Sequence, residues 1–151
     1  MCGIYGSINN LKPDLNELKN SLNHRGPDGC GDYTYDNIYL YHSRLAIQDL
    51  SEKANQPFHY KHYTIIFNGE IYNHQELKKL CDGFDFRTES DTETLIALFI
   101  KYKNKMFDFL SCLIIFFTFP IPLTSIIVKI FYCFFKSFFY LCRCFLAYYR
   151  I

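Results

Sequence analysis

The sequence contains no tryptophan, only two methionines and, after Asp108, no acidic residue at all. Its formal net charge is only +1, and such a balance gives no reason to expect a nucleic-acid partner. The N-terminus also lacks the charged and apolar regions of a signal peptide, since the first charged residue is Lys12. At 151 residues the chain has room for one domain with a self-supporting core.

The cysteines show no sign of a disulfide framework. Their number is odd and their spacing does not repeat: Cys2, Cys30, Cys81, Cys112, Cys133, Cys142 and Cys144. Cys142 and Cys144 lack a second pair of ligands, so no metal site is predicted there. We therefore expect reduced thiols and a cytoplasmic protein.

Charge divides the chain into two unlike parts. Residues 1–108 hold all 15 acidic residues against 12 lysines and arginines, whereas residues 109–151 hold four basic residues and no acid. Residues 109–128 form an apolar run of 20, long enough to cross a bilayer. Basic residues then recur every seven positions: Lys129, Lys136, Arg143 and Arg150. This pattern predicts a hydrophobic helical tail with one basic stripe, and membrane association through residues 109–151 is an alternative to a purely cytoplasmic location.

Residues 1–110 have short apolar segments that alternate irregularly with helical patterns. We expect strands at 2–8, 37–42, 63–67 and 85–87, and helices at 14–22, 72–81 and from Ser90 onward. Asn68 and Gly69 predict a tight turn after the third of these strands. Ser90 and Glu93 have the spacing of a capping box. The class indicated is α+β.

Cys2 directly follows the initiator methionine. Removal of that methionine would give the cysteine a free α-amine, whose ordinary pKa is about 7.7–8.0. Such an amine can act as the base for its own thiol, directly or through one water. The alternative is a chance cysteine in a buried strand.

Six motifs support the first interpretation. In chain order they are Met1-Cys-Gly-Ile-Tyr-Gly6, His24-Arg-Gly-Pro-Asp28, Ser43-Arg-Leu-Ala-Ile-Gln-Asp-Leu50, Gln56-Pro57, Phe67-Asn-Gly-Glu-Ile-Tyr-Asn73 and Ser90-Asp-Thr-Glu93. Together they resemble the class II glutamine amidotransferase domain of asparagine synthetases, an N-terminal-nucleophile hydrolase, over residues 1–110. The resemblance implies an αββα sandwich, incomplete here because the family's later strand motifs are absent.

The resemblance also implies a role for each matched residue. Cys2 would attack the side-chain amide of glutamine and form a thioester. The Asn68 side chain and the Gly69 backbone N–H would form the oxyanion hole. A plain hairpin turn is the alternative for these two residues.

Three further residues would hold the substrate. By the same resemblance, Arg44 binds the α-carboxylate of glutamine, Asp91 binds its α-ammonium group, and the backbone at Glu70 helps to hold it. Placement at a helix start should favour the ionised form of Asp91. The alternatives are a solvated Arg44, a capping role for Asp91 and a surface carboxylate at Glu70. Arg25 and Asp28 are interpreted as a loop that supports the nucleophile.

Four histidines outside the motif loop receive no role and are expected in solvated loops: His42, His59, His62 and His74.

The function implied is hydrolysis of glutamine to glutamate and ammonia, as the glutaminase part of an asparagine synthetase. No cofactor is expected in this chain, because ATP and Mg²⁺ belong to the synthetase domain, which is missing here and would be the natural partner. Without it, and with an incomplete sandwich, we expect impaired activity. A related synthetase with another acceptor and a non-catalytic membrane-associated fragment are the alternatives. Residues 111–151 would be the product of a shifted reading frame, a membrane anchor or a divergent core segment.

Overall fold

The structure is a computed structural model that describes residues 2–8, 13–110, 112–121 and 125–129. Three helices are present in this part of the chain: α1 (Leu15–Leu22), α2 (His74–Lys78) and α3 (Asp91–Tyr102). Two 3₁₀ segments occupy Glu52–Ala54 and Lys103–Asp108. The strands are β1 (Gly3–Ile8), β2 (Gly29–Tyr35), β3 (Ile38–Arg44), β4 (Phe58–Tyr60), β5 (Tyr63–Ile71), β6 (Cys112–Ile121) and β7 (Ser125–Lys129).

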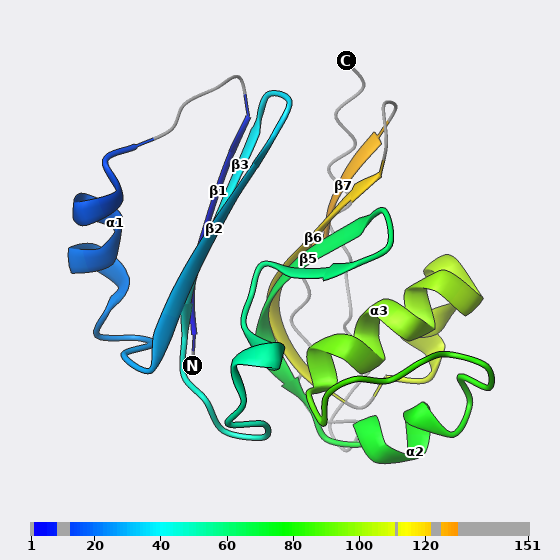
Figure 1. Cartoon of the computed structure of the whole chain (residues 1–151). Helices are drawn as coiled ribbons and strands as arrows, with labels where there is room; N and C mark the ends of the chain where they lie inside the picture. The colour runs from blue at the N-terminus through cyan, green and yellow to red at the C-terminus, as the bar shows by residue number, and fades with distance from the viewer. Residues whose placement is uncertain (1, 9–12, 111, 122–124, 130–151) are drawn as a thin grey trace, which may run out of the picture.

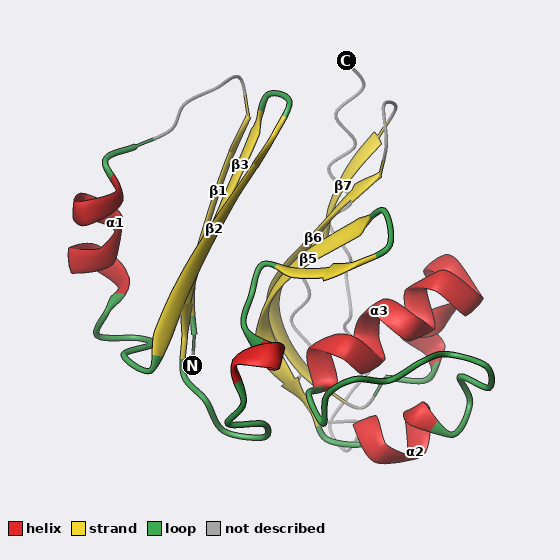
Figure 2. Cartoon of the chain, in the orientation of Figure 1, coloured by secondary structure: helices red, strands yellow, loops and turns green. Residues whose placement is uncertain are grey.

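The strands form two antiparallel sheets that lie between helices. One sheet has the order β1-β3-β2 and the other the order β4-β5-β6-β7. Helix α1 lies outside the first sheet, and α2 and α3 lie outside the second, as Figures 1 and 2 show. The order across the molecule is therefore helix, sheet, sheet, helices, and the class is α+β as predicted.

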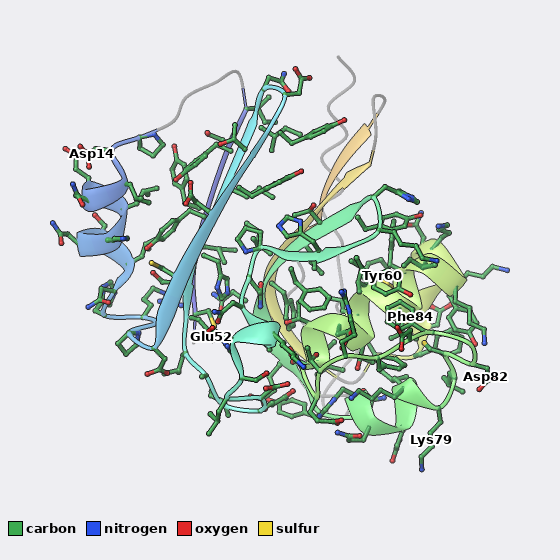
Figure 3. All side chains as sticks on the ribbon, viewed as in Figure 1. Asp14, Glu52, Tyr60, Lys79, Asp82 and Phe84 are labelled. Atoms are coloured by element: carbon green, nitrogen blue, oxygen red, sulfur yellow. The ribbon has the colours of Figure 1, made fainter. Side chains whose placement is uncertain are left out.

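Helix α1 is fixed at its start by Asp14, whose carboxylate accepts the N–H groups of Asn16 at 2.6 Å and Glu17 at 3.3 Å (Figure 3). Its Leu18 packs against Tyr39 and Tyr41 of β3. This small cluster attaches α1 to the outer face of the first sheet.

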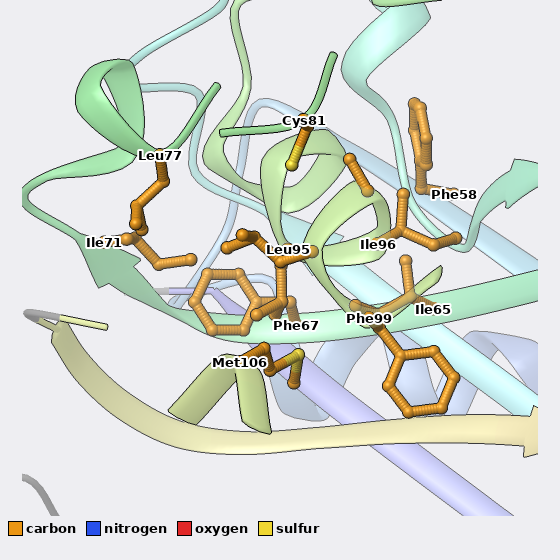
Figure 4. Packing of buried hydrophobic residues seen from close by; sticks show 12 residues of the cluster. Phe58, Ile65, Phe67, Ile71, Leu77, Cys81, Leu95, Ile96, Phe99 and Met106 are labelled. Atoms are coloured by element: carbon orange, nitrogen blue, oxygen red, sulfur yellow. The ribbon is translucent and has the colours of Figure 1, made fainter. Parts of the chain in front are cut away.

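The larger core lies between α3 and the second sheet (Figure 4). Its fully or nearly buried members are Phe58, Ile65, Phe67, Ile71, Leu77, Cys81, Leu95, Ile96, Ala97, Leu98, Phe99 and Met106. At the margin of this core, Tyr60 of β4 stacks on Phe84 with ring centroids 4.2 Å apart (Figure 3). Because β5 forms one wall of this core, the residues that end β5 are held rigidly.

His42 is fully buried, so the prediction of a solvated loop is wrong for this residue. Strand β3 runs on to Arg44, and its Tyr39 and Tyr41 face α1, so His42 faces the second sheet. Burial there, the largest cause, lowers the pKa of His42 to about 4.

Strand β5 does not end at Asn68-Gly69, so the predicted tight turn is wrong. The strand continues to Ile71, and its register against β6 shifts between Asn68 and Gly69. The physical reason is that β6 supplies pairing partners for residues 66–71. The local preference of Asn-Gly for turns carries no information on such a distant partner. The shift arises because one residue of β6, Ile115, has no partner on β5.

The prediction of a helical tail is wrong for the described residues after 110, because 112–121 and 125–129 form β6 and β7. In a continuous apolar run the polar and apolar residues do not alternate, so no repeat distinguishes a strand from a helix. Isoleucine, phenylalanine and threonine are all common in strands. The edge of β5 that is not paired with β4 then supplies backbone hydrogen-bond partners for β6. The basic stripe from residue 130 onward lies outside the described residues. No helix in the described part of the chain is long and apolar enough to span a membrane.

Two smaller predictions also need correction. Residues 85–87 form no strand, because the Glu93 carboxylate accepts the N–H groups of Arg87 and Thr88 instead. Ser90 caps α3 by accepting the Thr92 N–H at 3.2 Å, but Glu93 does not complete a capping box. Strands β2 and β4 carry no strong sequence pattern and were not predicted.

Candidate active site

The thiol of Cys2 lies one residue before β1 and is held by the backbone at Leu45. The Leu45 N–H donates to Sγ at 3.4 Å, and Sγ lies 3.8 Å from the Leu45 carbonyl oxygen. The cysteine is half-buried and unpaired. The backbone N–H and carbonyl of Leu45 together fix the position of the sulfur.

The loop of residues 24–28 ties the N-terminus to the end of β3. Arg25 Nε donates to the Cys2 carbonyl oxygen at 3.0 Å, and Asp28 Oδ2 accepts the Ala46 N–H at 2.8 Å. Gly26 lies so close to β3 that a Cβ there would be 2.3 Å from the Ser43 carbonyl oxygen. Only glycine fits at this point, and the loop therefore fixes the position of the thiol.

A cavity of about 110 Å³ opens beside Cys2. Five of the six predicted site residues line it: Cys2, Arg44, Gly69, Glu70 and Asp91. Asn68, the sixth, is buried directly before Gly69, where the register of β5 against β6 shifts. Residues from four separate segments of the chain thus meet at one small space.

Arg44 is only 8% exposed, which excludes the alternative of a solvated surface charge. Its Nη1 donates to the Ser51 carbonyl oxygen at 2.8 Å and to Asn55 Oδ1 at 2.7 Å, and its Nη2 donates to the Asp49 carbonyl oxygen. These bonds fix the plane of the guanidinium group in the cavity wall. A planar cation in a fixed orientation suits a carboxylate ligand.

Asn68 and Gly69 occupy the place where β5 departs from regular pairing. The Oδ1 atom of Asn68 is buried and has no hydrogen-bond partner. The extra residue at this shift is Ile115 of β6, which lies between the partners of Asn68 and Gly69. Asn68 carries a side-chain N–H and Gly69 a backbone N–H, and such a pair of neighbouring donors is the kind of group that forms an oxyanion hole.

Asp91 and Glu70 form the acidic end of the cavity. Asp91 Oδ2 accepts the Ile71 N–H at 3.0 Å, and Glu70 Oε1 accepts from Gln48 Nε2 at 3.1 Å. Burial, and then the charge of Glu70, raise the pKa of Asp91 to about 6. The expectation that the helix start favours the ionised form is wrong in its net effect, because burial outweighs it.

Two glutamines at the site were not predicted. Gln56 is buried and joins two walls of the cavity, since its Oε1 accepts the Phe67 N–H at 2.6 Å and its Nε2 donates to Thr92 Oγ1 at 3.0 Å. Gln48 contacts both Glu70 and Asp91. Both lie inside the six motifs given above, and this was the only feature of the sequence that could have identified them. Within the described ranges, no group of three or more histidine, cysteine or acidic side chains is arranged to hold a metal ion.

Comparison with known proteins identifies the family of the chain. The family model described as a glutamine amidotransferase domain matches residues 1–121, so the match extends through β6. Asparagine synthetase B (glutamine-hydrolysing) of Escherichia coli (strain K12) is 40% identical over 121 residues, which cover 74% of this chain and 21% of the relative.

Two further relatives show the same partial coverage. Glutamine-hydrolysing asparagine synthetase of Zea mays is 37% identical over 119 residues, which cover 74% of this chain and 20% of that protein. A putative glutamine-hydrolysing asparagine synthetase of Methanocaldococcus jannaschii is 38% identical over 130 residues, which cover 70% of this chain and 24% of that protein. The chain thus spans about a fifth to a quarter of the length of these relatives. The match over residues 1–121, together with the cavity beside Cys2, places this chain in the glutamine amidotransferase domain family.

Proposed function

We propose that this chain hydrolyses glutamine to glutamate and ammonia at Cys2. The observation that supports this most strongly is the cavity that joins a backbone-held thiol, a fixed guanidinium group and a carboxylate pair. Free glutamine carries an α-carboxylate, an α-ammonium group and an amide, and each has a suitable counterpart there.

In the proposed reaction the α-amine of Cys2, freed by removal of Met1, takes the thiol proton. The sulfur attacks the amide carbon, and the oxyanion that forms accepts hydrogen bonds from the Asn68 side-chain amide and the Gly69 backbone N–H. The C–N bond then breaks, and ammonia leaves with a proton returned by the amine. Water attacks the γ-glutamyl thioester, the C–S bond breaks, and glutamate and the free thiol result.

Arg44 would bind the α-carboxylate, and Asp91 with Glu70 would bind the α-ammonium group. The charges of the two ends of the cavity are opposite, so they specify one orientation of the substrate. Asp91 must be ionised to attract the ammonium group. Because its pKa is raised to about 6, binding should weaken as the pH falls below that value.

The wider role that we propose is that of the glutaminase part of an asparagine-synthetase-type reaction in the cytoplasm. The relatives described above are named glutamine-hydrolysing, which favours this role over a non-catalytic one. The four-layer order of helices and sheets suits an N-terminal-nucleophile hydrolase of the αββα type. ATP, Mg²⁺ and the acceptor would bind a synthetase domain, the proposed partner, and the acceptor would be aspartate or a related acid.

The test is glutamate release from glutamine by the full chain, beside a Cys2→Ala variant. We expect slow turnover that Cys2→Ala abolishes, because the nucleophile is lost. Cys30→Ala is the matched control, since Cys30 is an exposed free thiol on β2. Equal glutamate release by Cys2→Ala and the unchanged chain would overturn the proposal. Mass spectrometry of the same samples shows whether Met1 has been removed.

A further inference from the structure

Gln48 makes contacts that no proposed step uses. It is half-buried in the loop after β3 and lines the cavity. Its Nε2 donates to Glu70 Oε1 at 3.1 Å, and its Oε1 accepts the Asp91 N–H at 3.2 Å. One neutral side chain therefore contacts both acidic residues at this end of the cavity.

The loop that carries Gln48 is fastened to the start of α3. The neighbouring Asp49 accepts the Glu89 N–H at 2.8 Å through Oδ2, next to the Gln48 contact with Asp91. The first N–H groups of a helix have no acceptor within the helix. Gln48 supplies one for Asp91, and this contact fixes the distance between the loop and the acidic residue.

The two carboxylates need such an intermediary. Glu70 and Asp91 lie close enough for the charge of Glu70 to disfavour ionisation of Asp91. Two like charges in a half-enclosed space tend to move apart or to take up a proton. An amide that donates to one of them and holds the backbone of the other keeps both in place for a cation.

We propose that Gln48 is a positioning residue that holds Glu70 and Asp91 in the arrangement that binds the α-ammonium group of glutamine. The inference rests on the proposed function and adds a determinant of substrate affinity. It concerns the ammonium end alone, because the contacts of Arg44 are made to Asp49, Ser51 and Asn55 and not to the Gln48 side chain.

The test compares Gln48→Met with the unchanged full chain by alkylation of Cys2 with iodoacetamide, followed by mass spectrometry. Glutamine in the cavity, bound or as the thioester, should shield the thiol, so the concentration that halves the alkylation rate measures the apparent affinity for glutamine even where glutamate release is too slow to follow. Methionine keeps the length of the side chain but loses both hydrogen bonds. We expect this concentration to rise about tenfold, as the loss of one hydrogen bond to a carboxylate and one from a backbone N–H implies. Where glutamate release is measurable, KM should rise by a similar factor while kcat changes less than about threefold.

Glutaramate, which is glutamine without its α-amino group, separates positioning from general damage. If Gln48 acts through the carboxylate pair, Gln48→Met should leave the protection by glutaramate unchanged. Gln75→Met is the matched control, because the Gln75 amide contacts Glu89 at 3.4 Å, is exposed and lies outside the cavity lining. Gln48→Asn, which is too short to reach both partners, should show the same trend if the methionine variant does not fold.

The outcomes are distinguishable. A loss of glutamine affinity with unchanged glutaramate affinity supports the inference. Equal protection of the variant and the unchanged chain, or an equal loss for both ligands, overturns it and leaves the proposed function standing. If glutamine does not shield Cys2 in the unchanged chain, both the inference and the proposed function are overturned.

Discussion

The two ends of the cavity are built in different ways. At the basic end, Arg44 is held by oxygen atoms of Asp49, Ser51 and Asn55, all within a single short loop. At the acidic end, Asp91 and Glu70 come from different elements and are joined through the Gln48 side chain. The basic end has a permanent charge in a fixed plane, whereas the charge of the acidic end depends on pH and on a neutral intermediary. In the proposed function, orientation of the substrate would be set at Arg44 and its affinity would be adjusted at Asp91.

The largest effect should come from Arg44→Lys. Lysine keeps the charge but has one nitrogen instead of a planar fork, so it cannot satisfy the loop oxygens and a substrate carboxylate together. We expect kcat/KM for glutamine to fall about 100-fold, corresponding to the loss of charge-assisted hydrogen bonds. Arg87→Lys is the matched control, because the Arg87 side chain is half exposed. A loss below threefold would show that the charge alone suffices and that the basic end has no special geometry.

A smaller loss of affinity should come from Asp91→Asn. Asparagine keeps an oxygen for the Ile71 N–H but carries no charge, so we expect KM for glutamine to rise about tenfold at pH 8. In the unchanged chain, kcat/KM should decline below pH 6 as Asp91 takes up a proton, given its pKa of about 6. The variant should lack this decline. Identical pH profiles for the two proteins would assign the titration to another group.

A third effect concerns stability and not activity. The pKa of Asp91 is raised to about 6 in the folded chain, from 3.8, so the folded state holds its proton more tightly than the unfolded state. This group therefore contributes stability below about pH 4 that is lost as the pH rises to 6. The Asp91→Asn variant should not show this loss. From pH 4 to pH 7 the unfolding free energy of the unchanged chain should therefore fall by up to about 3 kcal/mol more than that of the variant. Urea unfolding at the two pH values measures the difference, and parallel curves would contradict it.

The motifs predicted which residues line the candidate cavity far better than which residues hold them in place. Cys2, Arg44, Gly69, Glu70 and Asp91 could be chosen from sequence because each lies in a short motif with a distinct chemical character. Gln48 and Gln56 could not, because their importance comes from partners 11 to 43 positions away along the chain. The burial of His42 was missed for a related reason, since only the second sheet covers it.

Secondary structure shows a similar division. Helix α1 was predictable because Asp14 and the spacing of Leu15, Leu18 and Leu22 are local signals. The continuation of β5 to Ile71 and the strands β6 and β7 were not, because an apolar run adopts whichever state offers its backbone partners. Those partners lie on another strand, and no local pattern identifies them.

The residues alone determined the α+β class and identified Cys2, Arg44, Glu70 and Asp91 as candidate site residues, because these follow from side-chain chemistry and short-range order. Tertiary structure alone decided that those residues meet in one cavity, that Asn68 and Gly69 lie where the register of β5 shifts, and that the pKa of Asp91 is raised. Burial, strand pairing and the field of neighbouring charges depend on which distant segments come together, and that is settled only when the two sheets and their helices pack.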